Sequence, residues 1–99
     1  MARLDVYLMP GRHGHVLDVQ AELLSHLSTR AVVPLLPKAD APPPIAELNP
    51  TFDLNGEPHV MVTQAIASVP VKELKQAIAS LGNCHDDVTR ALDILLTGF

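Results

Sequence analysis

A β-hairpin is predicted for the stretch Thr51-Phe52-Asp53-Leu54-Asn55-Gly56-Glu57-Pro58-His59-Val60-Met61-Val62. Two runs rich in apolar residues, 51–54 and 59–62, flank Asn55-Gly56, and both turn residues tolerate the positive φ that a two-residue hairpin turn requires. Pro58 is expected at the start of a strand, because proline cannot donate to a ladder. This hairpin belongs to a region before residue 67 that we predict to consist of strands and turns.

A second hairpin is predicted at the beginning of the chain. Apolar Leu4, Val6 and Leu8 alternate with polar neighbours, the period-two pattern of a half-buried strand. A turn cluster at 10–14 follows, and 16–19 forms the next strand. The two strands should therefore pair with each other.

The next segment is a strand followed by a long loop. Residues 30–36 are predicted as a third strand, and Pro34 within it indicates an edge strand or a bulge. Residues 37–50 contain five prolines, which predicts an extended and exposed loop with polyproline character. Such a loop could bind proline-recognising domains, but the composition favours a stiff connector.

Helical periodicity is found in the last third of the chain. Val71, Leu74, Ile78 and Leu81 fall on one helical face, so a helix is predicted over 71–81 and Gly82 should end it. A second helix follows, for which Asn83 is the expected N-cap, with Asp86 and Asp87 in the first turn, where they complement the helix dipole. Its core-facing stripe is expected to consist of Val88, Ala91, Leu92 and Leu95.

The end of this second helix carries more apolar surface than one core contact requires. Ile94, Leu96 and Phe99 lie off the core-facing stripe, and no polar tail follows them. Gly98 is expected to end the helix in a left-handed conformation. Phe99 is then either packed inward or offered to a partner.

Composition excludes several classes of protein. Residues 1–99 should form a single domain, with a thin core that dimerisation would help. The net charge of −4 argues against a groove that tracks a nucleic-acid backbone. One cysteine excludes an internal disulfide, and the absence of a secretory or membrane-spanning segment predicts a cytoplasmic protein.

No constellation of catalytic residues is visible. His13 and His15 could share a metal, although exposed turn histidines without a third ligand explain them better. Cys84-His85 could form a reactive pair whose thiol pKa is lowered by a helix N-terminus, yet adjacent helical side chains point apart. We therefore expect no enzyme, no cofactor and no metal.

Three leucines between the second and third strands leave an alternative open. Leu23, Leu24 and Leu27 are either tucked under the loop as a satellite of the core or presented to a partner. The sequence favours neither interpretation.

Several segments, taken in order, resemble the CcdB family of gyrase-poisoning toxins from bacterial toxin–antitoxin modules. The resemblance covers almost the whole chain, and its most specific segment is the last one below. The matching segments are Val6-Tyr7, Leu17-Asp18-Val19-Gln20, Thr29-Arg30-Ala31-Val32-Val33-Pro34-Leu35 and Ala67-Ser68-Val69-Pro70-Val71, followed by a short helix, a second helix and a terminal Gly plus apolar residue.

The resemblance implies a fold, partners and a mechanism. The implied fold is mainly β with α: a five-stranded antiparallel SH3-like barrel with a C-terminal helix, assembled as a homodimer. The implied mechanism is not enzymatic, since the family's C-terminus binds the DNA gyrase A subunit and traps the DNA-cleaved complex. A cognate antitoxin with a disordered C-terminal segment neutralises the toxin, and the toxin–antitoxin complex represses its own operon. DNA is thus contacted only through that complex.

The resemblance also implies which residues bind gyrase. The family's terminal Trp-Gly-apolar tripeptide corresponds to Thr97, Gly98 and Phe99, so that Thr97 replaces the tryptophan. Supporting contacts in the family correspond to Asp93 on the helix and to Ala21, Leu23 and Leu24 in the loop.

Two other functions remain open at this point. A homologue that no longer poisons gyrase could keep dimerisation, antitoxin binding and operon control, and Thr97 motivates this alternative. An endoribonuclease of the MazF type would share the implied fold, although the acidic balance argues against it.

Overall fold

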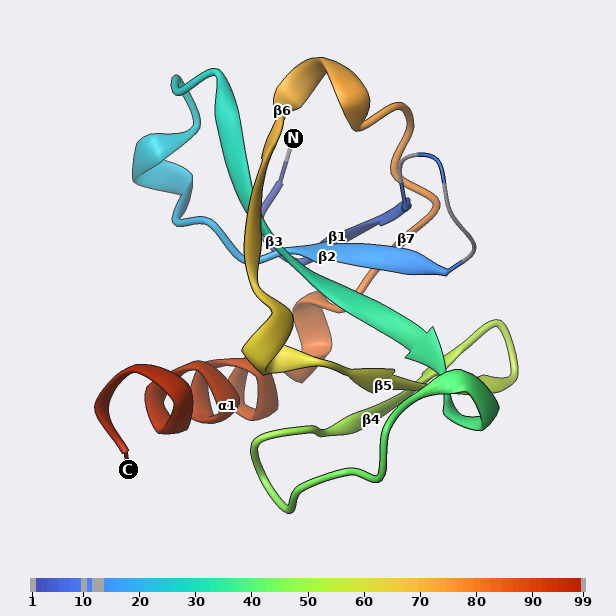
Figure 1. Ribbon diagram of the computed structural model, residues 1–99. Helices are drawn as coiled ribbons and strands as arrows, with labels where there is room; N and C mark the ends of the chain where they lie inside the picture. Colours follow the sequence, from blue (N-terminus) through green and yellow to red (C-terminus); the bar gives the residue numbers. More distant parts are fainter. Residues whose placement is uncertain (1, 10, 12–13, 99) are drawn as a thin grey trace.

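The strand β3 (Thr29–Pro37) is the longest of the fold, and the other strands are arranged around it. It pairs antiparallel with β2 through its central residues 32–35, whereas on its other edge its first residues pair with β6 and its last residues pair with β5. The sheet therefore curls, and it forms a nearly closed antiparallel barrel with a helix packed against it (Figure 1).

The computed structural model describes residues 2–9, 11 and 14–98. In this part of the chain the implied antiparallel barrel with a C-terminal helix is confirmed, with seven strands instead of five, and α1 follows the last of them. The two-residue β7 is one of the additional strands and covers the free edge of β1. The elements besides β3 are β1 (Asp5–Leu8), β2 (His15–Asp18), β4 (Thr51–Leu54), β5 (Glu57–Met61), β6 (Ala67–Pro70), β7 (Ala79–Ser80), α1 (His85–Thr97) and five 3₁₀ helices, η1 (Glu22–Leu24), η2 (Lys38–Asp40), η3 (Thr63–Ala65), η4 (Val71–Glu73) and η5 (Gly82–Cys84).

Both predicted hairpins are present. β4 and β5 pair through a turn in which Asn55 has φ 55° and Gly56 has φ 85°, the left-handed values expected of this dipeptide. Pro58 is the second residue of β5 and lies opposite Asp53. β1 and β2 pair antiparallel as well, although Pro10, Arg12 and His13 of their predicted turn lie outside the described residues.

Pro34 does not lie on an edge strand, so that part of the prediction is wrong. It is an interior residue of β3, opposite Val16 of β2. Its carbonyl accepts the N–H of Val62 at 2.9 Å, and the N and C=O of one strand residue face the same side. The missing N–H therefore faces the edge where β3 changes partner from β6 to β5, and no ladder bond is lost there.

The simple alternation predicted for the first strand is also wrong. Val6 and Tyr7 are both buried, whereas Leu8 is 64% exposed. Val6 belongs to the main core, and Tyr7 to a second, smaller cluster with Val16, Val32 and Leu74 on the other face of the sheet. A strand that is covered on both faces cannot show a polar face.

The helix predicted over residues 71–81 does not form. Only η4 is helical there, and the chain then runs extended into β7. The N–H of Ile78 donates to Val6 O, and that of Leu81 to Leu4 O, each at 2.8 Å. Pairing with β1 thus replaces the helical bonds, and Ile78, predicted to face the core, is 42% exposed.

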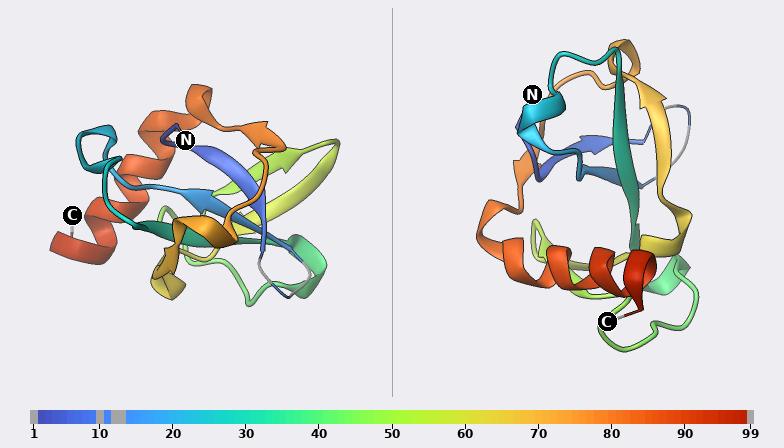
Figure 2. Two further views of the ribbon diagram at one scale, coloured as in Figure 1. Left: turned by 90° about the horizontal axis from the view of Figure 1, so that it is seen from above. Right: turned by 90° about the vertical axis from the view of Figure 1, so that its left-hand side faces the viewer.

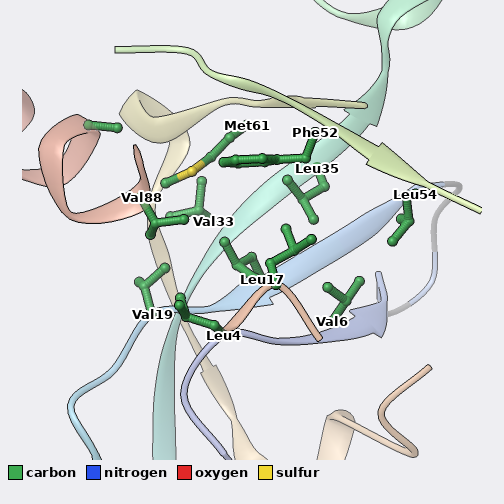
Figure 3. Packing of buried hydrophobic residues seen from close by; sticks show 12 residues of the cluster. Leu4, Val6, Leu17, Val19, Val33, Leu35, Phe52, Leu54, Met61 and Val88 are labelled. Atoms are coloured by element: carbon green, nitrogen blue, oxygen red, sulfur yellow. The ribbon is translucent and has the colours of Figure 1, made fainter. Parts of the chain in front are cut away.

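The main core fills the barrel and extends to α1. Figure 3 shows Met61 close to Phe52, and Val88 of α1 beside Val33 of β3. The helix contributes its fully buried residues Val88 and Ala91. The buried members of this cluster are Leu4, Val6, Leu17, Val19, Val33, Leu35, Phe52, Leu54, Met61, Leu81, Val88 and Ala91.

Candidate functional site: the end of α1 and the η1 turn

The helix α1 positions three of the residues to which the resemblance assigns gyrase contact. It begins after Cys84, which is the N-cap residue in place of the predicted Asn83, and no side chain caps it. Asp86 and Asp87 lie in the first turn as predicted, where they complement the helix dipole. Because Val88 and Ala91 fix one face of α1 to the core, its last turn is held in a defined direction.

The helix ends at Gly98 as the sequence predicts. Gly98 has φ 86°, and its N–H donates to Asp93 O at 3.2 Å and to Ile94 O at 3.0 Å. The hydroxyl of Thr97 also donates to Asp93 O, at 2.6 Å. Asp93, Thr97 and Gly98 are exposed, so this helix end presents a carboxylate, a back-bonded hydroxyl and open backbone. Phe99 lies outside the described residues.

Leu96 gives this helix end its apolar character. The sequence placed Leu96 off the core-facing stripe but assigned it no role. Leu96 is 72% exposed, whereas Leu92, Ile94 and Leu95 are half-buried. The sequence pattern could have identified Leu96 as an exposed residue, because it falls outside the stripe that packs on the core.

The turn between β2 and β3 presents the remaining predicted residues. Leu23 is 86% exposed, and Leu24 and Leu27 are each 41% exposed. Ala21 is exposed as well, and its carbonyl accepts the N–H of Leu24 at 2.9 Å. Within a single chain, these leucines are therefore not packed under the loop, which was one of the two interpretations left open by the sequence.

A buried polar network that the sequence did not predict lies beneath this turn. Asp18 accepts two bonds from Arg30, from Nε at 2.9 Å and from Nη2 at 2.6 Å, and both side chains are at most 1% exposed. The backbone N–H of Gln20 donates to Asp18 Oδ1 at 3.0 Å, and its side chain donates to Leu24 O in the turn at 2.9 Å. The matching segments of the resemblance contain all three residues, but periodicity alone gave no reason to pair them.

The two parts of the candidate site lie on the same side of the molecule but not side by side. Figures 1 and 2 place η1 near the chain's N-terminus, whereas the end of α1 lies at the opposite end of that side. Asp93, Thr97 and Gly98 form one group, and Ala21, Leu23 and Leu24 form another. A partner that touches both groups on one chain must span that side.

The other chemical candidates do not assemble into a site. His15 contacts the ring of His59 at 5.3 Å between centroids, and no metal-binding group of three suitable side chains exists within the described part of the chain. Burial and the nearby Asp87 carboxylate raise the pKa of the Cys84 thiol, so the proposed lowering by the helix N-terminus is wrong. His85 instead lies 3.4 Å from Asp86, and both are exposed.

The strands and α1 define a small, nearly closed antiparallel barrel with one C-terminal helix. In solved structures the barrel is similar to "Mycobacterium tuberculosis toxin MazF-mt6", with a TM-score of 0.70 and 18% identity over 93% of each chain. It is also similar to "Crystal structure of Mtb toxin", with a TM-score of 0.68 and 17% identity over 95% of this chain and 99% of that one. At this identity the likeness concerns the fold alone.

The chain belongs to the CcdB family, whose model, described as "CcdB protein", matches residues 3–98. This membership supports a toxin of a toxin–antitoxin module, with an antitoxin as its partner. In the described part of the chain, no helix has the length and apolar character needed to cross a bilayer.

Proposed function

We propose that this protein is a homodimeric toxin that acts in the cytoplasm on DNA gyrase. The end of α1 and the η1 leucines would contact the gyrase A subunit and hold the enzyme in its DNA-cleaved state, without any catalytic step by the toxin. A cognate antitoxin would cover this surface and release gyrase, and the toxin–antitoxin complex would repress its own operon.

The observation that carries the proposal is the exposure of Leu23. Its side chain is 86% exposed, yet its turn is fixed by backbone hydrogen bonds and by the buried network below it. Burying a leucine against a partner is worth about 1.5–3 kcal/mol. A rigid, exposed apolar side chain is suited to anchoring a protein partner.

The replacement of the family tryptophan by Thr97 sets the expected strength of binding. Truncating a tryptophan at an interface hot spot costs about 2–4 kcal/mol, which corresponds to roughly 30- to 1000-fold in affinity. Thr97 bonds to the backbone of its own helix through its hydroxyl and does not offer an aromatic surface. We therefore propose that Phe99, Leu96 and Leu23 supply apolar contact to a gyrase whose surface suits them.

The test is the affinity for the gyrase A subunit of the protein's own host. Leu23→Ser should weaken binding by about 10- to 100-fold, since it removes one buried leucine from the interface. Ile45→Ser is the matched control, because Ile45 is 55% exposed in the loop between β3 and β4 and belongs to neither exposed group. Equal affinity of the wild type and Leu23→Ser would contradict the proposed contact.

A second candidate function rests on Thr97 itself. A homologue without the aromatic anchor would keep dimerisation, antitoxin binding and operon control but would not poison gyrase. Harmless overexpression together with tight antitoxin binding would favour this function. Cell killing that the antitoxin reverses would reject it.

A further inference from the structure

Gln20 connects the η1 turn to the body of the barrel. It lies two residues after the end of β2 and is only 9% exposed. Its Nε2 donates to Leu24 O at 2.9 Å, and its Oε1 accepts the N–H of Ala31 at 3.0 Å. The side-chain amide of Gln20 therefore provides a hydrogen-bond donor to a carbonyl of the turn and an acceptor for an N–H of β3.

The backbone of Gln20 is itself anchored to the buried ion pair. Its N–H donates to Asp18 Oδ1 at 3.0 Å, while Asp18 Oδ2 is held by Arg30. Because the backbone of Gln20 is already fixed, its side chain loses little conformational freedom when it makes its two hydrogen bonds. Gln20 is thus preorganised to hold whatever it bonds to.

The turn has little packing of its own to keep it in place. Residues 21–29 are all exposed, and η1 contains no buried residue. The N–H of Arg3 donates to the exposed Glu22 carboxylate at 2.6 Å, and the far end of the loop is tied by Val71 N–H to Ser28 O at 2.9 Å. The bond from Gln20 is the contact that joins Leu24 to a buried side chain.

We propose that Gln20 is a positioning residue that holds η1 in the conformation presenting Leu23 and Leu24 to a protein partner. The identity of that partner rests on the proposed function, but the ordering of the turn is a property of the toxin alone. Loss of the Gln20 side-chain bonds should release the turn while the barrel stays folded.

Amide hydrogen exchange in Gln20→Met tests the ordering directly. Methionine keeps the volume of the side chain but can neither donate to Leu24 O nor accept from Ala31. Exchange of the Leu24, Ser25 and Leu27 amides should accelerate by about tenfold, the effect of losing one hydrogen bond, while the Val62 amide of the barrel changes less.

The matched control makes the same substitution in another loop. Gln64 is exposed and its Oε1 accepts from Asn49 Nδ2 at 2.8 Å, so Gln64→Met also removes a side-chain hydrogen bond of a glutamine amide. It should leave the amides of η1 unchanged. If the η1 amides of Gln20→Met exchange at the wild-type rate, the proposal is overturned.

A second variant covers the case in which Gln20→Met does not fold. Gln20→Glu keeps an acceptor for the Ala31 N–H but replaces the donor to Leu24 O with a carboxylate oxygen, which cannot donate and adds a negative charge. Faster exchange of the η1 amides in this variant supports the proposal, and protection equal to wild type overturns it.

Affinity for the host gyrase A subunit separates this proposal from the proposed function. Gln20→Met should bind about tenfold more weakly than both wild type and Gln64→Met, since the leucines must be ordered on binding. A loosened turn with unchanged affinity overturns the positioning role. If the wild type itself does not bind, the proposed function fails, and the exchange data alone decide whether Gln20 orders the turn.

Discussion

The Asp18–Arg30 pair places two opposite charges in the interior of the protein, out of contact with water. Their side chains are 0% and 1% exposed, and Arg30 Nη1 has no hydrogen-bond partner. Removing charges from water costs several kcal/mol per ion, and mutual attraction offsets that cost only while both partners are present. Each residue therefore depends on the other.

Arg30→Met should destabilise the fold by about 3–5 kcal/mol, because it leaves the Asp18 carboxylate buried without its countercharge. Arg90→Met is the matched control: Arg90 pairs with Glu47 at 2.8 Å, but both side chains are more than half exposed. That substitution should cost at most about 1 kcal/mol. Urea unfolding measures both values, and similar losses would contradict the account of the buried pair.

A pair of histidines makes stability depend on pH. His15 and His59 contact edge to face at 5.3 Å, and His15 Nδ1 is buried without a partner. Burial, followed by repulsion from His59, lowers the pKa of His15 below its ordinary value of 6.5, and Glu57 opposes this only in part. The folded state thus favours neutral His15.

Stability should fall as the pH drops below about 6.5, because the unfolded chain then binds a proton that folded His15 resists. At higher pH His15 is neutral in both the folded and the unfolded chain, so it no longer lowers the stability of the folded state. His15→Gln should reduce the loss of stability between about pH 7.5 and about pH 5.5, whereas His26→Gln, at an exposed residue, should not. Urea midpoints at both pH values decide this, and identical pH slopes in wild type and His15→Gln would refute it.

Among the elements, those with strong local signals were predictable and those fixed by distant pairing were not. The 51–62 hairpin follows from Asn55-Gly56, and the end of α1 follows from Gly98, because each residue determines its own backbone. The 71–81 segment carries helical periodicity, but an isolated helix of this length is marginal. Pairing with the edge of β1 is a long-range contact that periodicity cannot reveal.

Hydrogen exchange distinguishes the observed strand from the helix that periodicity predicts. The amides of Ile78 and Leu81 should be protected by their bonds to Val6 O and Leu4 O, whereas those of Lys75 and Gln76 should exchange rapidly. A helix over 71–81 would protect Lys75 and Gln76 as well, through bonds to the preceding turn. Protection of these two amides would contradict the extended chain described here.

On the scale of the whole molecule, the candidate site was predicted in part. The resemblance named Asp93, Thr97 and Gly98, as well as the η1 leucines, and all of them prove to be exposed. Their arrangement as two groups along one side could not be predicted, because it depends on how α1 docks against the barrel. The supporting network under η1 was missed because it depends on strand register, which places Asp18 opposite Val32 and so near Arg30.

The proposed homodimer gives a prediction about size. A chain of 99 residues buries a modest share of its surface, so burying more of it in a dimer would add stability. Sedimentation equilibrium at micromolar concentration should give twice the mass of the 10.7 kDa chain. A single species of monomer mass across that range would remove the dimer from the proposed function.

A supercoiling and DNA-cleavage assay with gyrase from the protein's own host measures whether the protein poisons gyrase through the end of α1. We expect inhibited supercoiling and accumulated cleaved DNA. Both effects should be lost when residues 98–99 are deleted from a protein that stays folded, and both should be stronger in Thr97→Trp. Normal supercoiling without cleaved DNA at micromolar wild-type protein would contradict this expectation.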